Sequence, residues 1–239
     1  MSEHQPFLFT RGGNDSLLFC KAESLLTLRF KNEYQVMPWM IHFREGDEEQ
    51  RVSLPESLPQ GRVVIECNPH LQQEEGGLRL IYSAGCMEHD TAPIRYSLMT
   101  CLLDQTLVPD EMPVSLHPCF TGTVVNDIII SAKKTAEGDL LMIGNDLYRI
   151  GNMRAIYRIS TVFDMFGKVV ITGGDESSPH SYLLDMDTLT FREILNDSGN
   201  PVYKCSILGD NLIYAVKGIG EHRYLETSGY TLGQLETLT

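Results

Sequence analysis

The chain has 239 residues and a formal net charge of −13, from 19 Lys and Arg against 32 Asp and Glu. This charge repels phosphate backbones and anionic membranes, so it argues against nucleic acid binding through a broad basic surface and against membrane attachment. With 42% hydrophobic residues the chain can bury a sizeable core, which argues against wholesale disorder.

The start of the sequence lacks the features of a signal peptide, and no apolar run reaches the roughly 18 residues that a membrane helix needs. The six cysteines contain no CxxC pair and mostly lie within apolar runs: Cys20, Cys67, Cys86, Cys101, Cys119 and Cys205. We interpret them as reduced core thiols, with Cys86 the most exposed because it follows Gly85 at a loop entrance. We expect a cytoplasmic protein, or one incorporated into an assembly made in the cytoplasm.

Five similar units are predicted along the chain, each with a short apolar strand that follows a turn. After a longer first interval, these central strands recur about every 40–50 residues. The four strands of each unit are expected at residues 7–10, 14–20, 25–30 and 39–43; 63–67, 77–83, 94–99 and 101–108; 120–125, 126–132, 139–143 and 147–150; 159–163, 167–172, 182–185 and 189–194; and 203–208, 210–216, 223–226 and 230–235. The long first interval contains an acidic run at residues 45–50 and a Pro-bearing segment at residues 53–61, both expected to be loop additions.

Units of this length cannot bury both faces alone, so they are expected to stack radially around a channel. The sequence therefore predicts an all-β fold: a five-bladed β-propeller of four-stranded antiparallel blades, in one domain over residues 1–239. A β-sandwich whose hairpins are alike by chance is the alternative. Few helices are expected.

The fourth unit carries a distinctive set of residues. Gly173-Gly174 follows a strand, and then come Tyr182, Asp187-Thr188 and the aromatic Phe191. This set resembles a kelch blade, although kelch repeats typically have Trp where this chain has Phe191. The resemblance covers one unit of five, and it implies a propeller blade rather than membership of the kelch proteins.

A five-bladed ring also resembles certain glycosidase scaffolds, whose chemistry requires two carboxyl groups flanking the sugar. The candidates are Glu66 and Asp164, because they lie on predicted first strands that would line the channel. Asp127 and Asp210 follow turns and are better explained as turn residues. No GxSxG, P-loop or HExxH pattern is present, and we expect no cofactor and no metal site.

Apart from catalysis, the sequence indicates that surface loops recognise a partner. The predicted loops at residues 46–60, 86–93, 175–180 and 217–222 would project from one rim, and the first three are acidic or mixed. The residues expected to contact a partner with a basic or polar face are Asp47, Glu48, Glu49, Glu88, His89, Asp90, Asp175 and Glu176. Ordinary solvated connections are the alternative interpretation of these loops.

We therefore expect a non-enzymatic module that binds another protein, as a structural component of a large assembly such as a phage virion. The alternative is a carbohydrate-binding or glycoside-hydrolysing propeller, in which exposed tyrosines would stack on sugars; those available are Tyr82, Tyr96, Tyr148, Tyr157 and Tyr214. A third hypothesis is a subunit that closes its ring only on oligomerising.

Overall fold

The structure is a computed structural model that describes residues 6–11, 14–21, 24–29, 40–45, 48–53, 57–59, 61–74, 77–103, 114–162, 165–174, 178–203, 205–208, 211–215 and 225–239. For residues before 58, and for some later strand residues, the description covers the backbone only. In this part of the chain the fold is all-β and contains no helix, as predicted, and every paired strand is antiparallel. None of the described residues forms a helix that could cross a membrane.

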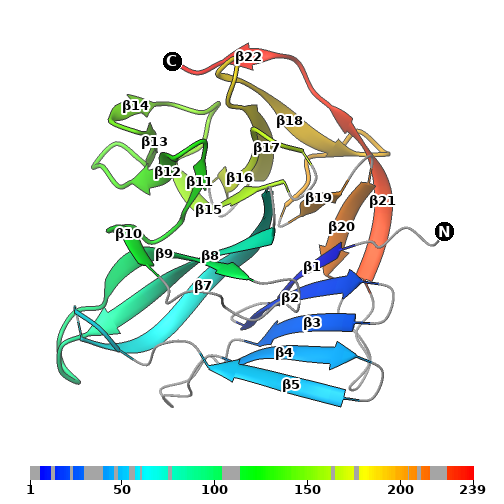
Figure 1. Cartoon of the computed structure of the whole chain (residues 1–239). Coiled ribbons are helices and arrows are strands. Elements are labelled where there is room, and N and C mark those ends of the chain that lie inside the picture. The colour runs from blue at the N-terminus through cyan, green and yellow to red at the C-terminus, as the bar shows by residue number, and fades with distance from the viewer. Residues whose placement is uncertain are drawn as a thin grey trace. The chain divides into compact units, whose positions relative to one another are not determined.

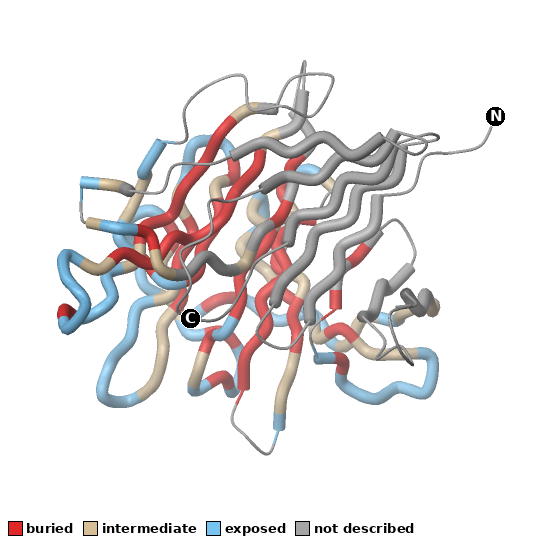
Figure 2. Tube along the Cα trace, turned by 90° about the horizontal axis from the view of Figure 1, so that it is seen from below, coloured by how far each residue is buried: buried red, intermediate tan, exposed pale blue. Residues whose placement is uncertain are grey.

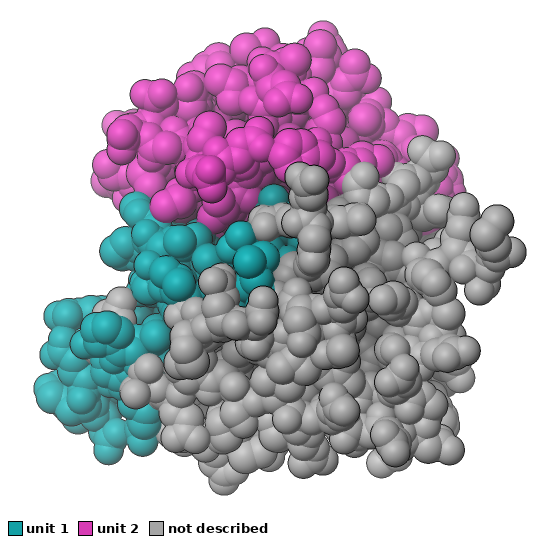
Figure 3. All heavy atoms as spheres, viewed as in Figure 1, with its two compact units in different colours: residues 1–120 teal, residues 121–239 magenta. Residues whose placement is uncertain are grey.

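The chain divides into two compact units, residues 1–120 and residues 121–239 (Figure 3). The first unit contains two five-stranded sheets. One has the order β1 (Pro6–Arg11), β2 (Asn14–Lys21), β3 (Ser24–Arg29), β4 (Met40–Glu45) and β5 (Glu48–Ser53). The other has the order β10 (Val114–His117), β9 (Arg95–Leu103), β8 (Gly77–Met87), β7 (Gly61–Glu74) and β6 (Ser57–Leu58) (Figure 1).

Two predictions for this unit are wrong. Residues 46–60 were expected to form a loop, but β5 pairs with β4 along its whole length. As the edge of its sheet, β5 can carry a polar, acidic sequence that composition alone assigns to a loop. Residues 101–108 were expected to form a separate strand, but residues 101–103 continue β9, where Cys101 is opposite Leu80, and the next strand that the structure describes is β10.

The core of the second sheet follows β8 and β9. Residues 80–86 are buried without interruption, as are residues 97–101, so these two strands are covered on both faces (Figure 2). A continuous buried run of this kind distinguishes a central strand from an edge strand with one solvated face.

The second unit contains a four-stranded and an eight-stranded sheet. The four-stranded sheet has the order β11 (Gly122–Val125), β12 (Ile128–Lys133), β13 (Leu140–Ile143) and β14 (Asp146–Tyr148), which is the third predicted unit. The eight-stranded sheet has the order β15 (Ala155–Thr161), β16 (Lys168–Gly174), β17 (Pro179–Asp185), β18 (Thr190–Asn196), β21 (Leu225–Leu232), β20 (Asn211–Ala215) and β19 (Ser206–Leu208), with β22 (Glu236–Thr237) also paired to β18.

The fourth and fifth predicted units are joined through β21. The strand pairs with β20 from Leu225 to Gly229 and then with β18 from Tyr230 to Leu232. Residues 223–226 and 230–235, predicted as two strands, are therefore mostly one strand that changes partner. A closed ring of five separate blades stays a prediction.

Strand β16 is buried on both faces. Successive side chains of a strand point to opposite faces of its sheet. On β16, Val169 and Ile171 point to one face and pack with the core of β11–β14. Val170 points to the other face and packs with Val202 and Ile207 of the β19 region. The second unit therefore has three layers, with β15–β18 in the middle. Neighbouring blades of a propeller pack face to face in this way.

The last residues of the sequence, 233–239, lie along β18, and we call this segment the strap. Glu236 and Thr237 form β22, and the strap adds three further backbone hydrogen bonds: Gly233 N–H to the Glu193 carbonyl at 2.8 Å, Leu238 N–H to the Leu189 carbonyl at 3.1 Å and Arg149 N–H to the Thr239 carbonyl at 2.7 Å. The Leu238 side chain is 7% exposed and belongs to the core between the two sheets. The strap therefore ties β18 to the segment that follows β14.

Candidate functional site

The predicted binding loop at residues 86–93 begins within β8, and residues 88–91 and 93 of it are exposed. Glu88, His89 and Asp90 are all exposed there. The Arg95 guanidinium donates a hydrogen bond to the Glu88 carboxylate at 2.7 Å, and that of Arg62 donates to Asp90 at 3.0 Å. Because each acid has a cationic partner, this loop offers a basic partner little net charge.

The other predicted site residues are described in part or not at all. Four lie outside the described residues: Asp47, Asp164, Asp175 and Glu176. Glu48 and Glu49 lie on β5, opposite Glu45 and Arg44, and Glu66 lies on β7, opposite Ala84; only the backbone of these three is described. The catalytic pairing of Glu66 with Asp164 therefore stays a prediction.

The turn between β15 and β16 displays an aromatic side chain that the sequence analysis did not single out. The Phe166 ring is 70% exposed. Its turn is closed by a hydrogen bond from Lys168 N–H to the Met165 carbonyl at 3.1 Å, with Gly167 at a φ of 74°. A positive φ at the third position is typical of a type II turn, which requires glycine there. The sequence signal was an aromatic residue directly before a turn glycine.

Two sets of contacts hold this turn rigidly. The Gly167 carbonyl accepts a hydrogen bond from Met186 N–H at 3.0 Å, and the Met165 side chain packs against the core beside β19. The Lys168 ammonium pairs with the Asp185 carboxylate on the neighbouring strand. Phe166 is thus an exposed ring on a fixed support.

A second exposed aromatic group lies at the opposite end of β15. The register of β15 shifts between Ile156 and Arg158, so a bulge turns Tyr157 outward while Arg158 is buried. The Tyr157 ring packs edge to face against Tyr203, with centroids 6.5 Å apart, and both side chains are 36% exposed. Tyr203 was predicted to begin a strand, but it lies in the connection before β19.

Two of the kelch-like residues are aromatic and pack against each other. Tyr182 and Phe191 lie on β17 and β18 and pack edge to face with centroids 5.2 Å apart. A Cβ at Gly173 would lie 2.2 Å from the Ala155 carbonyl oxygen, and Gly174 has a φ of 122°. The double glycine is therefore required both by close approach of β15 and by backbone conformation.

His180 Nδ1 lies within hydrogen-bonding distance of the Glu193 carboxylate, and the His180 ring stacks on Tyr182. Burial raises the pKa of Tyr182, and the carboxylates of Glu193 and Glu236 raise it further, against a hydrogen bond from the backbone of Asn152. These effects favour the protonated form of the Tyr182 hydroxyl. This cluster has the members of an acid–base pair, but its aromatic rings are packed in the core.

The described thiols are buried and reduced, as predicted: Cys86, Cys101, Cys119 and Cys205. The prediction that Cys86 would be exposed is wrong, because it faces the core from within β8. Burial raises the pKa of Cys119 to about 12. Burial also raises the pKa of Cys205 to about 11, although a Ser181 hydrogen bond and the Arg158 charge act in the other direction. Neither thiol has the low pKa of a nucleophilic cysteine.

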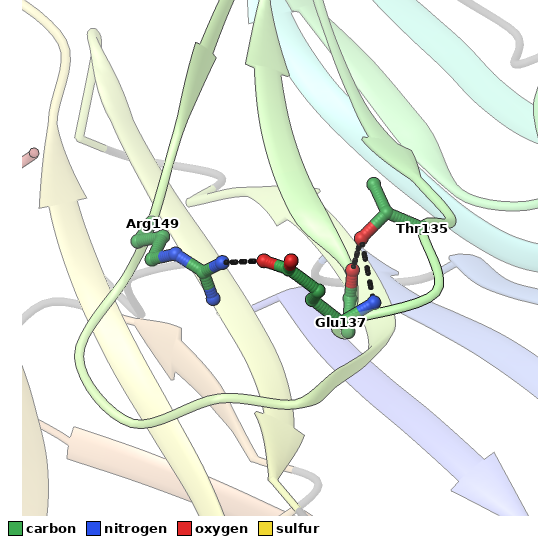
Figure 4. Close-up of polar contacts among 4 residues, drawn as sticks. Thr135, Glu137 and Arg149 are labelled. Carbon is green, nitrogen blue, oxygen red and sulfur yellow. Dashed lines mark hydrogen bonds and ion pairs between the residues drawn. The ribbon is translucent and has the colours of Figure 1, made fainter.

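The connection between β12 and β13 is held by its own polar contacts (Figure 4). The Thr135 hydroxyl accepts a hydrogen bond from Glu137 N–H at 3.2 Å and donates one to the Gly138 carbonyl. The Arg149 guanidinium donates to the Glu137 carboxylate at 3.2 Å. These contacts support the segment that bonds to the strap. Among the described residues, no group of three or more His, Cys, Asp or Glu side chains could hold a metal ion.

No known family model matches the chain, and no curated protein is significantly similar to it in sequence. Homology therefore assigns no function to any of these groups.

Proposed function

We propose that the protein is a non-enzymatic binding module for another protein, a component of a multi-subunit assembly such as a virion, built as a cytoplasmic five-bladed propeller. The observation that carries this proposal is the Phe166 ring, 70% exposed on a rigid turn. Aromatic anchors of this kind are enriched among the residues that dominate binding energy at protein interfaces.

The rigidity of the turn favours binding. When the backbone beneath an anchor is already held in place, a partner that encloses the anchor has only the side chain left to order. The turn is fixed by the Gly167 conformation, the Met186 hydrogen bond and the Lys168–Asp185 ion pair. The unbound protein therefore presents Phe166 ready for a matching pocket.

The charge beside the ring indicates the chemistry of the partner. The Asp187 carboxylate lies close to Gly167, with its oxygens 3.7 and 3.8 Å from the position of a Cβ added there. Because the whole chain also carries a net charge of −13, a cationic surface would be steered toward it. The partner that fits is a protein with an apolar pocket and a basic rim.

The test is a pull-down from the native source at moderate salt, with mass spectrometry of the retained proteins. Wild-type protein should retain a stoichiometric partner, and Phe166→Ala should lose it at least tenfold. The control is Leu147→Ala, which removes another exposed apolar side chain, on β14. Equal retention by Phe166→Ala and wild type would refute Phe166 as the anchor, and recovery of the protein alone would refute the module itself.

The second candidate function is carbohydrate binding, and the Tyr157–Tyr203 pair is the observation that favours it. Exposed tyrosine rings offer apolar faces and a hydroxyl group to a sugar. A glycan array would test it, with Tyr157→Ala and Tyr203→Ala expected to abolish any signal. If the protein also hydrolyses the glycan, Glu66→Gln and Asp164→Asn should each abolish turnover while binding remains.

A further inference from the structure

The strap is attached to the second unit mainly through its backbone. Its contacts along β18 are the two residue pairs of β22 and the hydrogen bonds of Gly233 and Leu238, and its last contact is to Arg149. One strap side chain, Leu238, is buried, while residues 234–237 are exposed. Backbone pairing with a single buried apolar anchor is the way in which extended peptides add to a sheet edge.

The connection that joins the strap to β21 is irregular and exposed. Leu232 is paired with Ile194, and Glu236 is paired with Phe191. The stretch of the strap between these two pairs is one residue longer than the facing stretch of β18. The extra residue breaks the ladder, and the Leu235 side chain there is 53% exposed. The strap can therefore leave β18 without disturbing the paired residues of β21.

Docking of the strap also brings two carboxylates of the same charge close together. The carboxylates of Glu236 on the strap and Glu193 on β18 both raise the pKa of the same Tyr182 hydroxyl, which places the two acids near one ring. The repulsion between the two carboxylates opposes docking of the strap, and removing the Glu236 charge should hold the strap more firmly.

We propose that the strap is exchangeable, so that the edge of β18 and the Leu238 site bind the strap of a second copy of this chain. The occupant follows from the structure itself, because residues 233–239 are the extended segment whose fit to this edge is observed. The same contacts form between copies as within one, which makes exchange of an identical element a low-cost route to a dimer.

The test uses the full chain. The protein is incubated at high concentration, diluted, and analysed by size-exclusion chromatography with light scattering. It should contain a dimer that dissociates slowly. The dimer fraction should rise with salt, which screens the net charge of −13 on each copy. Monomer alone at every concentration and salt would overturn the proposal.

Crosslinking then identifies the strap as the exchanged element. Thr190 on β18 is opposite Thr237 on the strap. One copy of the protein therefore carries Thr190→Cys, and a second copy with a different tag carries Thr237→Cys. The two copies are mixed and a short thiol crosslinker is added. A covalent species with both tags, absent from the parent protein, is expected, and Glu236→Gln in the second copy should slow its formation several-fold, because the strap must first leave the β18 of its own copy. A dimer that gives no such species, while the chain with both substitutions crosslinks within itself, would overturn the proposal.

Discussion

At the scale of single residues, Gly173 is the position where the packing of neighbouring strands most directly requires one residue type. An added Cβ would lie 2.2 Å from the Ala155 carbonyl oxygen and 2.7 Å from the Met153 sulfur. The backbone of β15 cannot withdraw from this contact, because it is paired with β16 on both sides of the bulge. The glycine is therefore required where β15 crosses the end of β16.

Gly173→Ala should lower the free energy of unfolding by roughly 1–3 kcal/mol, the usual effect of overpacking. Gly229→Ala is the matched control on β21, since its nearest obstacle is the movable Asp197 carboxylate; its effect should stay below about 1 kcal/mol. Urea unfolding followed by intrinsic fluorescence measures both. Equal effects of the two substitutions would contradict the close-approach explanation.

The Lys168–Asp185 pair should make stability depend on acidity. Burial acts to raise the pKa of Asp185, but the Lys168 ammonium and the N–H groups of Asp187 and Thr188 lower it overall. Because the pKa in the folded protein lies below that of the unfolded chain, the stabilisation is complete above the unfolded value, about 3.9, and is lost as the pH falls through the folded value.

Asp185→Asn should therefore reduce the free energy of unfolding by about 0.2–1 kcal/mol at pH 7. The difference from wild type should shrink as the pH falls below about 4, which urea titrations at several pH values would measure. Asp146→Asn, at an exposed position on β14, is the control and should have little effect at any pH. A difference that grows toward low pH would show that the sign is wrong.

Residues that form tight turns could be predicted from the sequence. Asp127 was assigned to a turn, and it lies with Asn126 at positive φ between β11 and β12, as a type I′ hairpin turn requires. The exposure of Phe166 was not predictable, because an apolar residue beside a turn is buried or exposed according to tertiary packing. Cys86 was misjudged for the same reason: small residues around it resembled a loop entrance, but they lie within β8.

At the scale of elements, the strap is the feature that local pattern missed. Its residues read as the end of an ordinary fourth strand, whereas β21 leaves β20 and continues along β18. The choice of partner strand depends on contacts far apart in the sequence, which period-2 alternation does not encode. Short apolar strands that follow a turn, such as β2, β12 and β16, were predicted to within about two residues.

Leu238→Ala should lower the free energy of unfolding by about 2–4 kcal/mol, because it removes a buried side chain from the core between the two sheets of the second unit. Leu235→Ala is the matched control on the same strap, and it should have almost no effect because the side chain is 53% exposed. Thermal unfolding of the two variants measures the contrast. Similar losses would mean that the strap stabilises the fold through its backbone alone.

At the scale of the whole molecule, the prediction to test is that the two units fold as one domain. The prediction of a single propeller over residues 1–239 requires one cooperative transition in calorimetry, with equal calorimetric and van't Hoff enthalpies. Two separate transitions would instead assign each compact unit its own stability. Gly173→Ala supplies the internal check, because in one cooperative domain it lowers the midpoint of the whole transition.

The proposed function depends on Phe166 being the anchor for a protein partner. Hydroxyl-radical footprinting measures this directly, by comparing labelling of Phe166 in the purified protein with labelling in an extract of the native source. The 70% exposed ring should be labelled readily when the protein is alone and several-fold less in the extract, while labelling of Leu147 stays unchanged. Equal labelling of Phe166 in both samples would contradict the account.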